Sequence, residues 1–238
     1  MTNIYSYIRQ AKLSKKKLLA VLLDPDKLDP NQLPFIVSKI NASPATHILI
    51  GGSLVLKDVI HEQIRIIKQC TDLPVVIFPG HPTQISPEAH GILLLSLLSG
   101  RNPDYLIGHH IEAAPILRKT NLEIIPTAYI LVDGGKQTAV EVVSQTAAMQ
   151  TSDSDKILHT AQAGEMLGMS LIYLEAGSGA KHPVSPHVIS KVACGTQIPI
   201  IVGGGITSKS QARDAFEAGA TMVVIGTAFE NNPSFFEQ

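Results

Sequence analysis

The sequence predicts a single domain, spanning residues 1–238, with the fold of a (β/α)8 barrel. Eight short apolar runs recur along the chain, and segments with helical periodicity separate most of them. The runs are apolar at consecutive positions, which is typical of parallel strands buried on both faces. The chain has 238 residues and is 45% hydrophobic, which suits one α/β barrel with a large core. An open, doubly wound sheet is the alternative arrangement of the same elements.

The expected strands are rich in leucine, isoleucine and valine, residues that favour a buried sheet. In chain order they are Leu18 to Leu23, His47 to Ile50, Val75 to Phe78, Ile92 to Leu95, Ile124 to Val132, Leu171 to Leu174, Ile198 to Val202 and Met222 to Ile225. The expected helices are amphipathic, and several have polar start signals or a glycine stop signal. They are Asn31 to Asn41, Val55 to Cys70, Tyr105 to Lys119, Asp155 to Gly168, Ser185 to Val192 and Ser208 to Ala218.

Two connections depart from a regular alternation of strand and helix. The third and fourth strands are separated by HPTQISPEAH, whose prolines leave little room for a helix. We therefore expect a loop to replace the helix after the third strand. The polar segment 134–154 is either an ordered insertion or a mobile surface loop, and its Ser, Thr and Gln content favours the loop.

The composition excludes several classes of function. A net charge of −1, from 19 basic and 20 acidic residues, provides no general field for nucleic acid, so an anion must be held by a local site. The sequence contains no run of about 18 apolar residues, so it predicts no transmembrane helix. Its first residues lack the apolar core of a signal peptide. Cys70 and Cys194 lie far apart in sequence and read as reduced thiols, so we expect a cytoplasmic protein.

Glycine turns end the last two expected strands. The seventh runs into Gly203-Gly204-Gly205 and the eighth into Gly226-Thr227. Barrels commonly hold phosphate between the loops after these strands, and glycine lets backbone N–H groups approach an anion. We expect Gly204, Gly205, Gly226 and Thr227 to bind a phosphate group; the alternative is that the glycines only form tight turns.

The sixth strand ends in a second glycine-containing turn that carries a carboxylate. Glu175 falls at the carboxyl end of a strand, where catalytic groups of barrels concentrate. It can bind a substrate hydroxyl and take its proton, and a capping or ion-paired glutamate is the alternative. The expected contacts with substrate are Tyr173, Leu174, Glu175, Ala176, Gly177, Ser178 and Gly179.

Oxygen-bearing side chains follow the first two strands. Asp24 ends the first strand in LLDPDK, and Ser53 follows the second in IGGS. Mg²⁺ prefers such ligands and usually takes one or two from the protein. The sequence therefore suggests a magnesium site at Asp24 and Ser53, while the alternative is that Asp24 and Asp26 cap the next helix. His109-His110 matches no zinc-site spacing, and we expect these histidines to be structural or exposed.

Taken together, LLDPDK, IGGS, YLEAGSGA, VGGGI and VIGTA resemble the geranylgeranylglyceryl phosphate synthase family of TIM-barrel prenyltransferases. The resemblance extends from about Leu18 to Phe229 and is most specific at YLEAGSGA. It implies transfer of a prenyl group from a polyprenyl diphosphate to the sn-3 hydroxyl of sn-glycerol 1-phosphate, with Mg²⁺ as cofactor. It also implies a step in phospholipid biosynthesis and a homo-oligomer, from a dimer to a hexamer.

Carried over residue by residue, the resemblance implies that Asp24 and Ser53 bind Mg²⁺ and that Glu175 contacts the glycerol hydroxyls. One branch of the family has a lysine two residues before the metal aspartate, where this chain has Leu22. This departure and the AGSGA turn favour a geranylgeranyl (C20) donor over a heptaprenyl one. The C20 prenyl chain of such a donor needs an apolar trench. Candidate walls are Ile77, Pro79, Leu95, Leu97, Ile107 and Tyr129.

Two other functions remain open from the sequence. One is a different phosphate-binding barrel enzyme, such as a sugar-phosphate isomerase, although such enzymes usually place an acid and a base on separate strands. The other is a barrel that binds phosphate or phospholipid without catalysis. For a prenyltransferase, we also expect transient contact with a membrane surface when the lipid product leaves.

Overall fold

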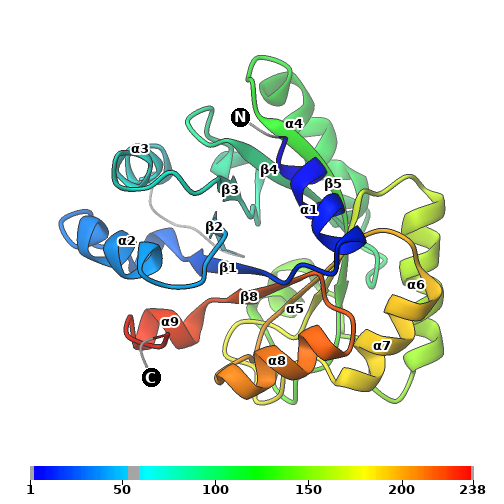
Figure 1. Cartoon of the computed structure of the whole chain (residues 1–238). Coiled ribbons are helices and arrows are strands. Elements are labelled where there is room, and N and C mark those ends of the chain that lie inside the picture. Colours follow the sequence, from blue (N-terminus) through cyan, green and yellow to red (C-terminus); the bar gives the residue numbers. More distant parts are fainter. Residues whose placement is uncertain (1–2, 53–58, 237–238) are drawn as a thin grey trace.

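The computed structural model describes residues 3–52 and 59–236 and contains a closed barrel of parallel strands (Figure 1). Each strand pairs with the next along the chain, and β1 pairs with β8 to close the ring. The strands are β1 (Leu18–Leu23), β2 (His47–Ile50), β3 (Val75–Ile77), β4 (Gly91–Leu97), β5 (Glu123–Leu131), β6 (Leu171–Glu175), β7 (Ile200–Gly203) and β8 (Met222–Ile225). The predicted (β/α)8 barrel is confirmed, and the open sheet is excluded.

Helices surround the barrel and cover the outer face of its strands (Figure 1). They are α2 (Leu33–Asn41), α3 (Ile60–Cys70), α4 (His109–Leu117), α6 (Ser154–Met166), α7 (Pro186–Gly195), α8 (Lys209–Glu217) and the short α9 (Thr227–Asn231). Because successive side chains of a strand point to opposite faces, each strand supplies two cores. Ile48 and Ile50 pack under the helices, whereas Leu49 between them faces the barrel interior.

Two expected helices have different beginnings in the structure. The α3 helix begins at Ile60, and the expected start at Val55 falls within residues 53–58, outside the described residues. The helix expected from Tyr105 consists of one π-helical turn, η3 (Asp104–Gly108), followed by α4. A π-helical turn inside a helix is rare and often lies at a functional site.

The connection after β3 is short, as expected from its prolines. Between β3 and β4 the chain forms only one 3₁₀ turn, η2 (Pro82–Gln84). Proline cannot donate the backbone hydrogen bond that a longer helix needs there. The loop predicted in place of a helix is therefore confirmed, and residues 79–82 and Ile85 of this connection line the groove described below.

The segment after β5 is ordered, so the expectation of a mobile surface loop is wrong. It contains α5 (Ala139–Ser144), whose first turn has a capping box. Thr138 Oγ1 accepts from the Glu141 amide, and the Glu141 carboxylate accepts from the Thr138 amide at 2.7 Å. Val132 and Met149 then pair across the base of the segment. The TAVE motif carries this capping signal, which the polar composition of its surroundings obscured.

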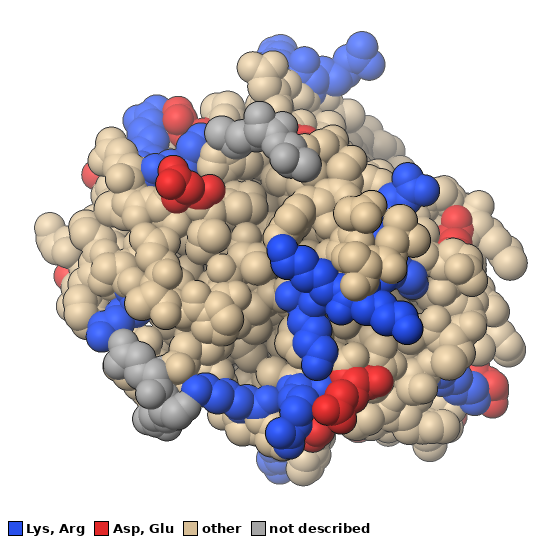
Figure 2. Space-filling view, viewed as in Figure 1, with Lys and Arg blue, Asp and Glu red and all other residues tan. Residues whose placement is uncertain are grey.

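An additional helix, α1 (Ile4–Leu13), covers the end of the barrel at which the strands begin (Figure 1). Its apolar face, with Ile4, Ile8 and Ala11, packs against the interior residues of the barrel. Lys and Arg side chains gather around the end of this helix (Figure 2), where the sequence places Arg9, Lys12 and 15–17. The small net charge of the chain therefore conceals a basic area on this end.

The N-terminus of α1 depends on a carboxylate from another element. Glu123, the first residue of β5, accepts hydrogen bonds from the backbone amides of Ile4 and Tyr5, the latter at 2.7 Å. No acidic residue of α1 itself lies in its first turn. A negative charge at this position stabilises both the free N–H groups and the positive end of the helix dipole.

We predict that Glu123→Ala lowers the free energy of unfolding by about 1–2 kcal/mol, because the first turn of α1 loses its cap. Urea denaturation followed by circular dichroism measures this change. Glu217→Ala is the matched control, since Glu217 makes only a distant surface pair of 3.9 Å with Arg213. A loss no larger in Glu123→Ala than in Glu217→Ala would contradict the proposed cap.

Candidate active site

A polar cavity lies at the carboxyl ends of the strands, the end of the barrel opposite α1. Residues that follow β1, β2, β6, β7 and β8 line it, together with part of the segment after β5. The sequence-predicted residues around this cavity are Asp24, Tyr173, Glu175, Gly177, Ser178, Gly179, Gly204, Gly205, Gly226 and Thr227. The fold thus brings together residues that are up to about 200 positions apart in the chain.

The turn after β7 requires glycine at two consecutive positions. Gly204 and Gly205 have φ angles of +79° and +67°, a conformation that is unfavourable for residues with a Cβ. A Cβ on Gly204 would also overlap the carboxylate of Glu175. Within the described chain, the amides of Gly204, Gly205 and Gly226 donate no hydrogen bond to another residue. These N–H groups are available to an anion in the cavity.

Glu175 is the last residue of β6, and its side chain is only 5% exposed. Its Oε1 accepts a hydrogen bond of 2.6 Å from the amide of Gly177. Burial raises the pKa of Glu175 to about 7, against the smaller lowering effects of the Gly177 amide and the Tyr173 hydroxyl. Among the described residues, no lysine or arginine forms an ion pair with this carboxylate. Such a carboxyl group can exchange a proton near neutral pH.

The turns that line the cavity contact one another across it. Ser178 Oγ lies 3.1 Å from Thr227 Oγ1, which joins the turn after β6 to the turn after β8. The segment after β5 lies against the same turn, because a Cβ on Gly177 would overlap the side chain of Thr138. Gly134 O accepts from the amides of Lys181 and His182 at 2.9 and 3.0 Å. The insertion therefore forms part of the cavity wall, which its composition did not indicate.

Two of the expected contacts, Leu174 and Ala176, do not line the cavity. Both side chains are fully buried in the core between strands and helices. Tyr173 and Glu175 alternate with them and face the interior. The period of two along a strand explains the difference. The side chains of Leu174 and Ala176 therefore do not contribute to the cavity wall, since only every second side chain of β6 faces the barrel interior.

Asp24 lies at the edge of the cavity, next to two charged residues that the motifs did not single out. Its carboxylate is 3.0 Å from Lys27 Nζ, which is also 3.0 Å from the carboxylate of Glu230 in α9. Burial lowers the pKa of Lys27, but the two carboxylates raise it by more. Asp24 Oδ1 also accepts from the amide of Asp26 at 3.1 Å. Ser53, the second expected metal ligand, lies outside the described residues.

Asp24 therefore combines two roles that the sequence left as alternatives. It caps the 3₁₀ turn η1 (Pro25–Lys27), and its carboxylate also lines the cavity. Asp24 and Glu230 provide carboxylate oxygens at one edge, which is the ligand chemistry that Mg²⁺ prefers. Lys27 lies three residues after Asp24 in the DPDK motif. No local signal connects Glu230 to Asp24, because the two meet only when β8 pairs with β1.

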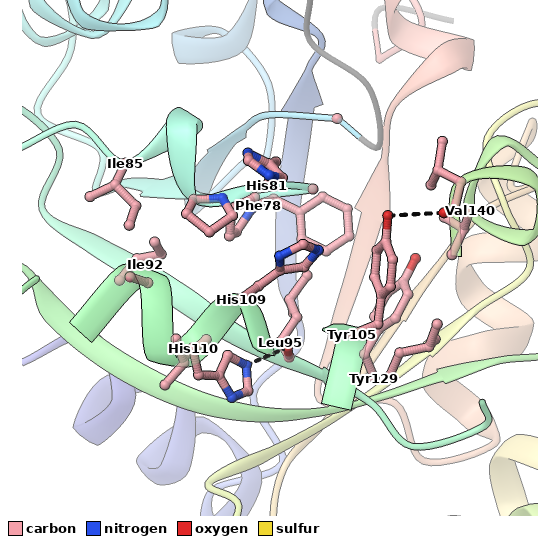
Figure 3. Close-up of a pocket in the computed structure, with 18 residues that line it drawn as sticks. Phe78, His81, Ile85, Ile92, Leu95, Tyr105, His109, His110, Tyr129 and Val140 are labelled. Atoms are coloured by element: carbon pink, nitrogen blue, oxygen red, sulfur yellow. Dashed lines mark hydrogen bonds between the residues drawn. The ribbon is translucent and has the colours of Figure 1, made fainter. Parts of the chain in front are cut away.

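Figure 3 shows a second hollow, an apolar groove, and this groove adjoins the polar cavity. It is bounded by β3, β4, the turn η2 and the helix α4. The groove and the cavity share Gly52, Phe78, Tyr129 and Val140 as lining residues. Phe78, which lines both, stacks on Tyr173, which lines the cavity, with ring centroids 5.1 Å apart.

Four of the six proposed trench residues line this groove: Pro79, Leu95, Leu97 and Tyr129. Ile77 and Ile107 do not line it. Ile77 is buried under the outer helices, and Ile107 is 54% exposed on the π-helical turn. His81, Tyr105, His109 and His110 also line the groove. His110 Nε2 lies 2.7 Å from the Leu95 carbonyl oxygen, which fits the expected structural role of this histidine. Burial lowers the pKa of His109, and the neighbouring His81 lowers it further.

We predict that Glu175 makes stability depend on pH. Its pKa is about 7 in the folded protein and 4.5 for a free side chain, so the folded state binds more protons between these values. The stabilisation is complete below about pH 4.5 and is lost as the pH rises through about 7, with a total on the order of 3 kcal/mol. Urea denaturation from about pH 5 to about pH 8 should show wild type losing stability relative to Glu175→Gln. Parallel curves would contradict the raised pKa; Glu62→Gln is the control expected to follow wild type.

Two solved structures with the same fold differ in how similar they are to this chain. The geranylgeranylglyceryl phosphate synthase of Thermoplasma acidophilum, solved with sn-glycerol-1-phosphate, has a TM-score of 0.93 and 33% identity, covering 100% of this chain and 95% of its own. A mutant tryptophan synthase α-subunit from Pyrococcus furiosus has a TM-score of 0.57 and 12% identity, over 92% of this chain and 93% of its own. The second likeness concerns the fold alone.

Two relatives extend the comparison at the level of sequence, and both are named geranylgeranylglyceryl phosphate synthase. The protein of Flavobacterium johnsoniae is 57% identical over 100% of this chain and 98% of its own length. That of Thermococcus gammatolerans is 40% identical over 96% and 90%. The resemblance to the geranylgeranylglyceryl phosphate synthase family is thus confirmed. Because the PcrB family matches residues 11–238, the chain belongs to the PcrB family.

Proposed function

We propose that the chain is a geranylgeranylglyceryl phosphate synthase, which joins geranylgeranyl diphosphate to the sn-3 hydroxyl of sn-glycerol 1-phosphate. The observation that carries this proposal is the junction of a polar cavity with an apolar groove through shared lining residues. A polar acceptor and a long apolar donor need these two compartments side by side. The names of the relatives, from bacteria and archaea, support the same reaction.

The acceptor would occupy the polar cavity. The free amides of Gly204, Gly205 and Gly226 would hold its phosphate, which stays through the reaction. Glu175 would bind the glycerol hydroxyls between this phosphate site and the shared aromatic wall. Fixing the attacking hydroxyl in this way removes the orientational freedom that it has in solution. Such positioning is a large part of catalysis in a two-substrate reaction.

The donor would place its prenyl chain in the apolar groove and its diphosphate near Asp24. Burial of the chain contributes about 0.8 kcal/mol for each CH₂ group, so the groove can supply most of the affinity. Lys27 provides a positive charge beside the expected diphosphate. We propose that Asp24, with Ser53, holds Mg²⁺, which when bound neutralises the leaving diphosphate. Glu230 supplies a further carboxylate oxygen at the same edge.

The proposed reaction forms one bond and breaks another at the first carbon of the prenyl chain. The bond from this carbon to the diphosphate oxygen breaks, and its electron pair leaves with the diphosphate. The sn-3 oxygen of the acceptor forms the new C–O ether bond. Its proton passes to the carboxylate of Glu175, whose pKa of about 7 suits a base that must also release the proton.

We further propose that the protein works as a homo-oligomer, a dimer or a hexamer. The region of η3 and α4 carries large apolar side chains that are exposed in the single chain, with Ile107 at 54% and Ile111 at 67%. Contact with a second copy would cover this surface. No helix among the described residues is long and apolar enough to cross a membrane. We propose a cytoplasmic enzyme that touches a membrane surface only transiently, when its product leaves.

Incubation of the protein with labelled sn-glycerol 1-phosphate and prenyl diphosphates of C15 to C35 tests the activity. We expect ether-linked product with a preference for C20, and an equal amount of diphosphate released. Glu175→Gln should lower kcat by about 100-fold or more, because the base is lost while the shape of the side chain is kept. Retention of glycerol phosphate without diphosphate release would instead indicate a binding protein, and an unchanged rate in Glu175→Gln would remove its catalytic role.

We predict that Asp24→Asn abolishes Mg²⁺-dependent transfer but leaves the affinity for sn-glycerol 1-phosphate largely unchanged. The reason is that the expected phosphate contacts are backbone amides, which this substitution does not change. Isothermal titration with the acceptor and a transfer assay over a range of Mg²⁺ concentrations measure the two effects separately. Asp26→Asn, a matched change in the same turn but outside the cavity lining, should remain active. Equal activity of Asp24→Asn and Asp26→Asn would contradict the metal site.

A further inference from the structure

Three potential metal ligands converge at one side of the apolar groove. They are His81, in the connection between β3 and the turn η2, and His109 and Glu112 in the first turn of α4. Their ligand atoms all lie within 4.8 Å of one another. Figure 3 shows His81 and His109 side by side next to the groove, and their ring centroids are 5.0 Å apart. The group combines two elements that are adjacent in space but not in sequence.

The placement and the contacts of these side chains suit them to binding a metal ion. His109 and Glu112 are three positions apart on one helix, which places them on the same face. His81 Nδ1 accepts from the Thr83 amide at 3.3 Å and lies 3.1 Å from Thr83 Oγ1, and these contacts orient the ring. With a metal ion at Nε2, the ring proton would move to Nδ1 and be donated to Thr83 Oγ1. His109 Nε2 is buried and has no hydrogen-bond partner among the described residues. A buried polar atom without a partner is costly unless something binds it.

We propose that His81, His109 and Glu112 form a site for Zn²⁺ or a similar transition-metal ion, with water at the remaining position. Two imidazoles and one carboxylate are a frequent ligand set for zinc, which is usually four-coordinate. Imidazole nitrogen is a poor ligand for Mg²⁺, which prefers oxygen. The site therefore differs in chemistry from the edge of the cavity at Asp24, and one ion does not substitute for the other.

Zinc at this site links two elements that bound the groove. His81 belongs to the connection after β3, and His109 directly follows the π-helical turn η3 that precedes α4. The bound ion holds these elements at a fixed separation, so the groove cannot widen between them. If the groove takes the prenyl chain, zinc lowers the rate of donor binding. This consequence rests on the proposed function, whereas the metal site does not.

Binding of Co²⁺ and Zn²⁺ to the full-length protein tests the site directly. Excess Mg²⁺ is kept present so that oxygen-rich sites are filled. We expect one Co²⁺ for each chain, with the intense visible absorption of a four- or five-coordinate ion, and displacement by Zn²⁺. Glu112→Gln should weaken Zn²⁺ binding by about 10- to 100-fold, and His81→Ala by at least as much. Glu62→Gln, a matched change on α3 away from the group, should bind as wild type does.

Absence of this absorption in wild type, or equal Zn²⁺ affinity in wild type, Glu112→Gln and His81→Ala, would overturn the proposal. Thermal unfolding of each variant without metal shows whether a loss of binding reflects a loss of the fold; a folded Glu112→Gln that binds weakly supports the site. The transfer assay with and without Zn²⁺ is a separate arm. There we expect a higher KM for the prenyl donor with zinc, and no such change in Glu112→Gln, whose side chain does not line the groove.

Discussion

The pairing of β1 with β8 is the constraint on which the site depends. Leu18 pairs with Met222 and Val21 with Ile225, so the last strand of the chain closes the ring against the first. This closure sets Asp24 beside Glu230, whose carboxylate accepts from the Asp24 amide at 3.2 Å although the two are 206 positions apart. The parallel arrangement also directs every strand toward the same end. Polar residues placed after separate strands then meet in one cavity without any contact between them along the chain.

Burial gives this cavity its chemistry. A carboxyl group at the mouth of a barrel in contact with water would be ionised at neutral pH. Glu175 instead lies below the glycine turns, beside the buried hydroxyl of Tyr173, and its pKa rises to about 7. The amide of Gly177 limits the rise by stabilising the charged form. The absence of a Cβ at Gly204 makes this arrangement possible, because the backbone after β7 occupies the space directly against the carboxylate.

Much of the fold and part of the site could be predicted from sequence, because those features are local. Consecutive apolar residues mark the strands, and the glycines of β7 and β8 mark turns whose amides are free. Residues that depend on side-chain direction were less predictable: Leu174 lies within the most specific motif but faces the outer core. The helix α1 and the Lys27–Glu230 pair were not predicted, since both depend on contacts between the two halves of the chain. The capping box of α5 was visible in the sequence but was outweighed by its polar surroundings.

The position of helix α1 has a consequence for where substrates bind and where products leave. By filling the end at which the strands begin, it leaves the opposite end as the side at which the cavity and the groove lie. In a prenyltransferase of this shape, both substrates and both products bind at the same end of the barrel. An ether lipid that keeps its tail in the groove then excludes the next donor, so the product is an inhibitor competitive with the donor. Turnover in such an enzyme depends on an acceptor for the lipid outside the protein as well as on the chemistry within it.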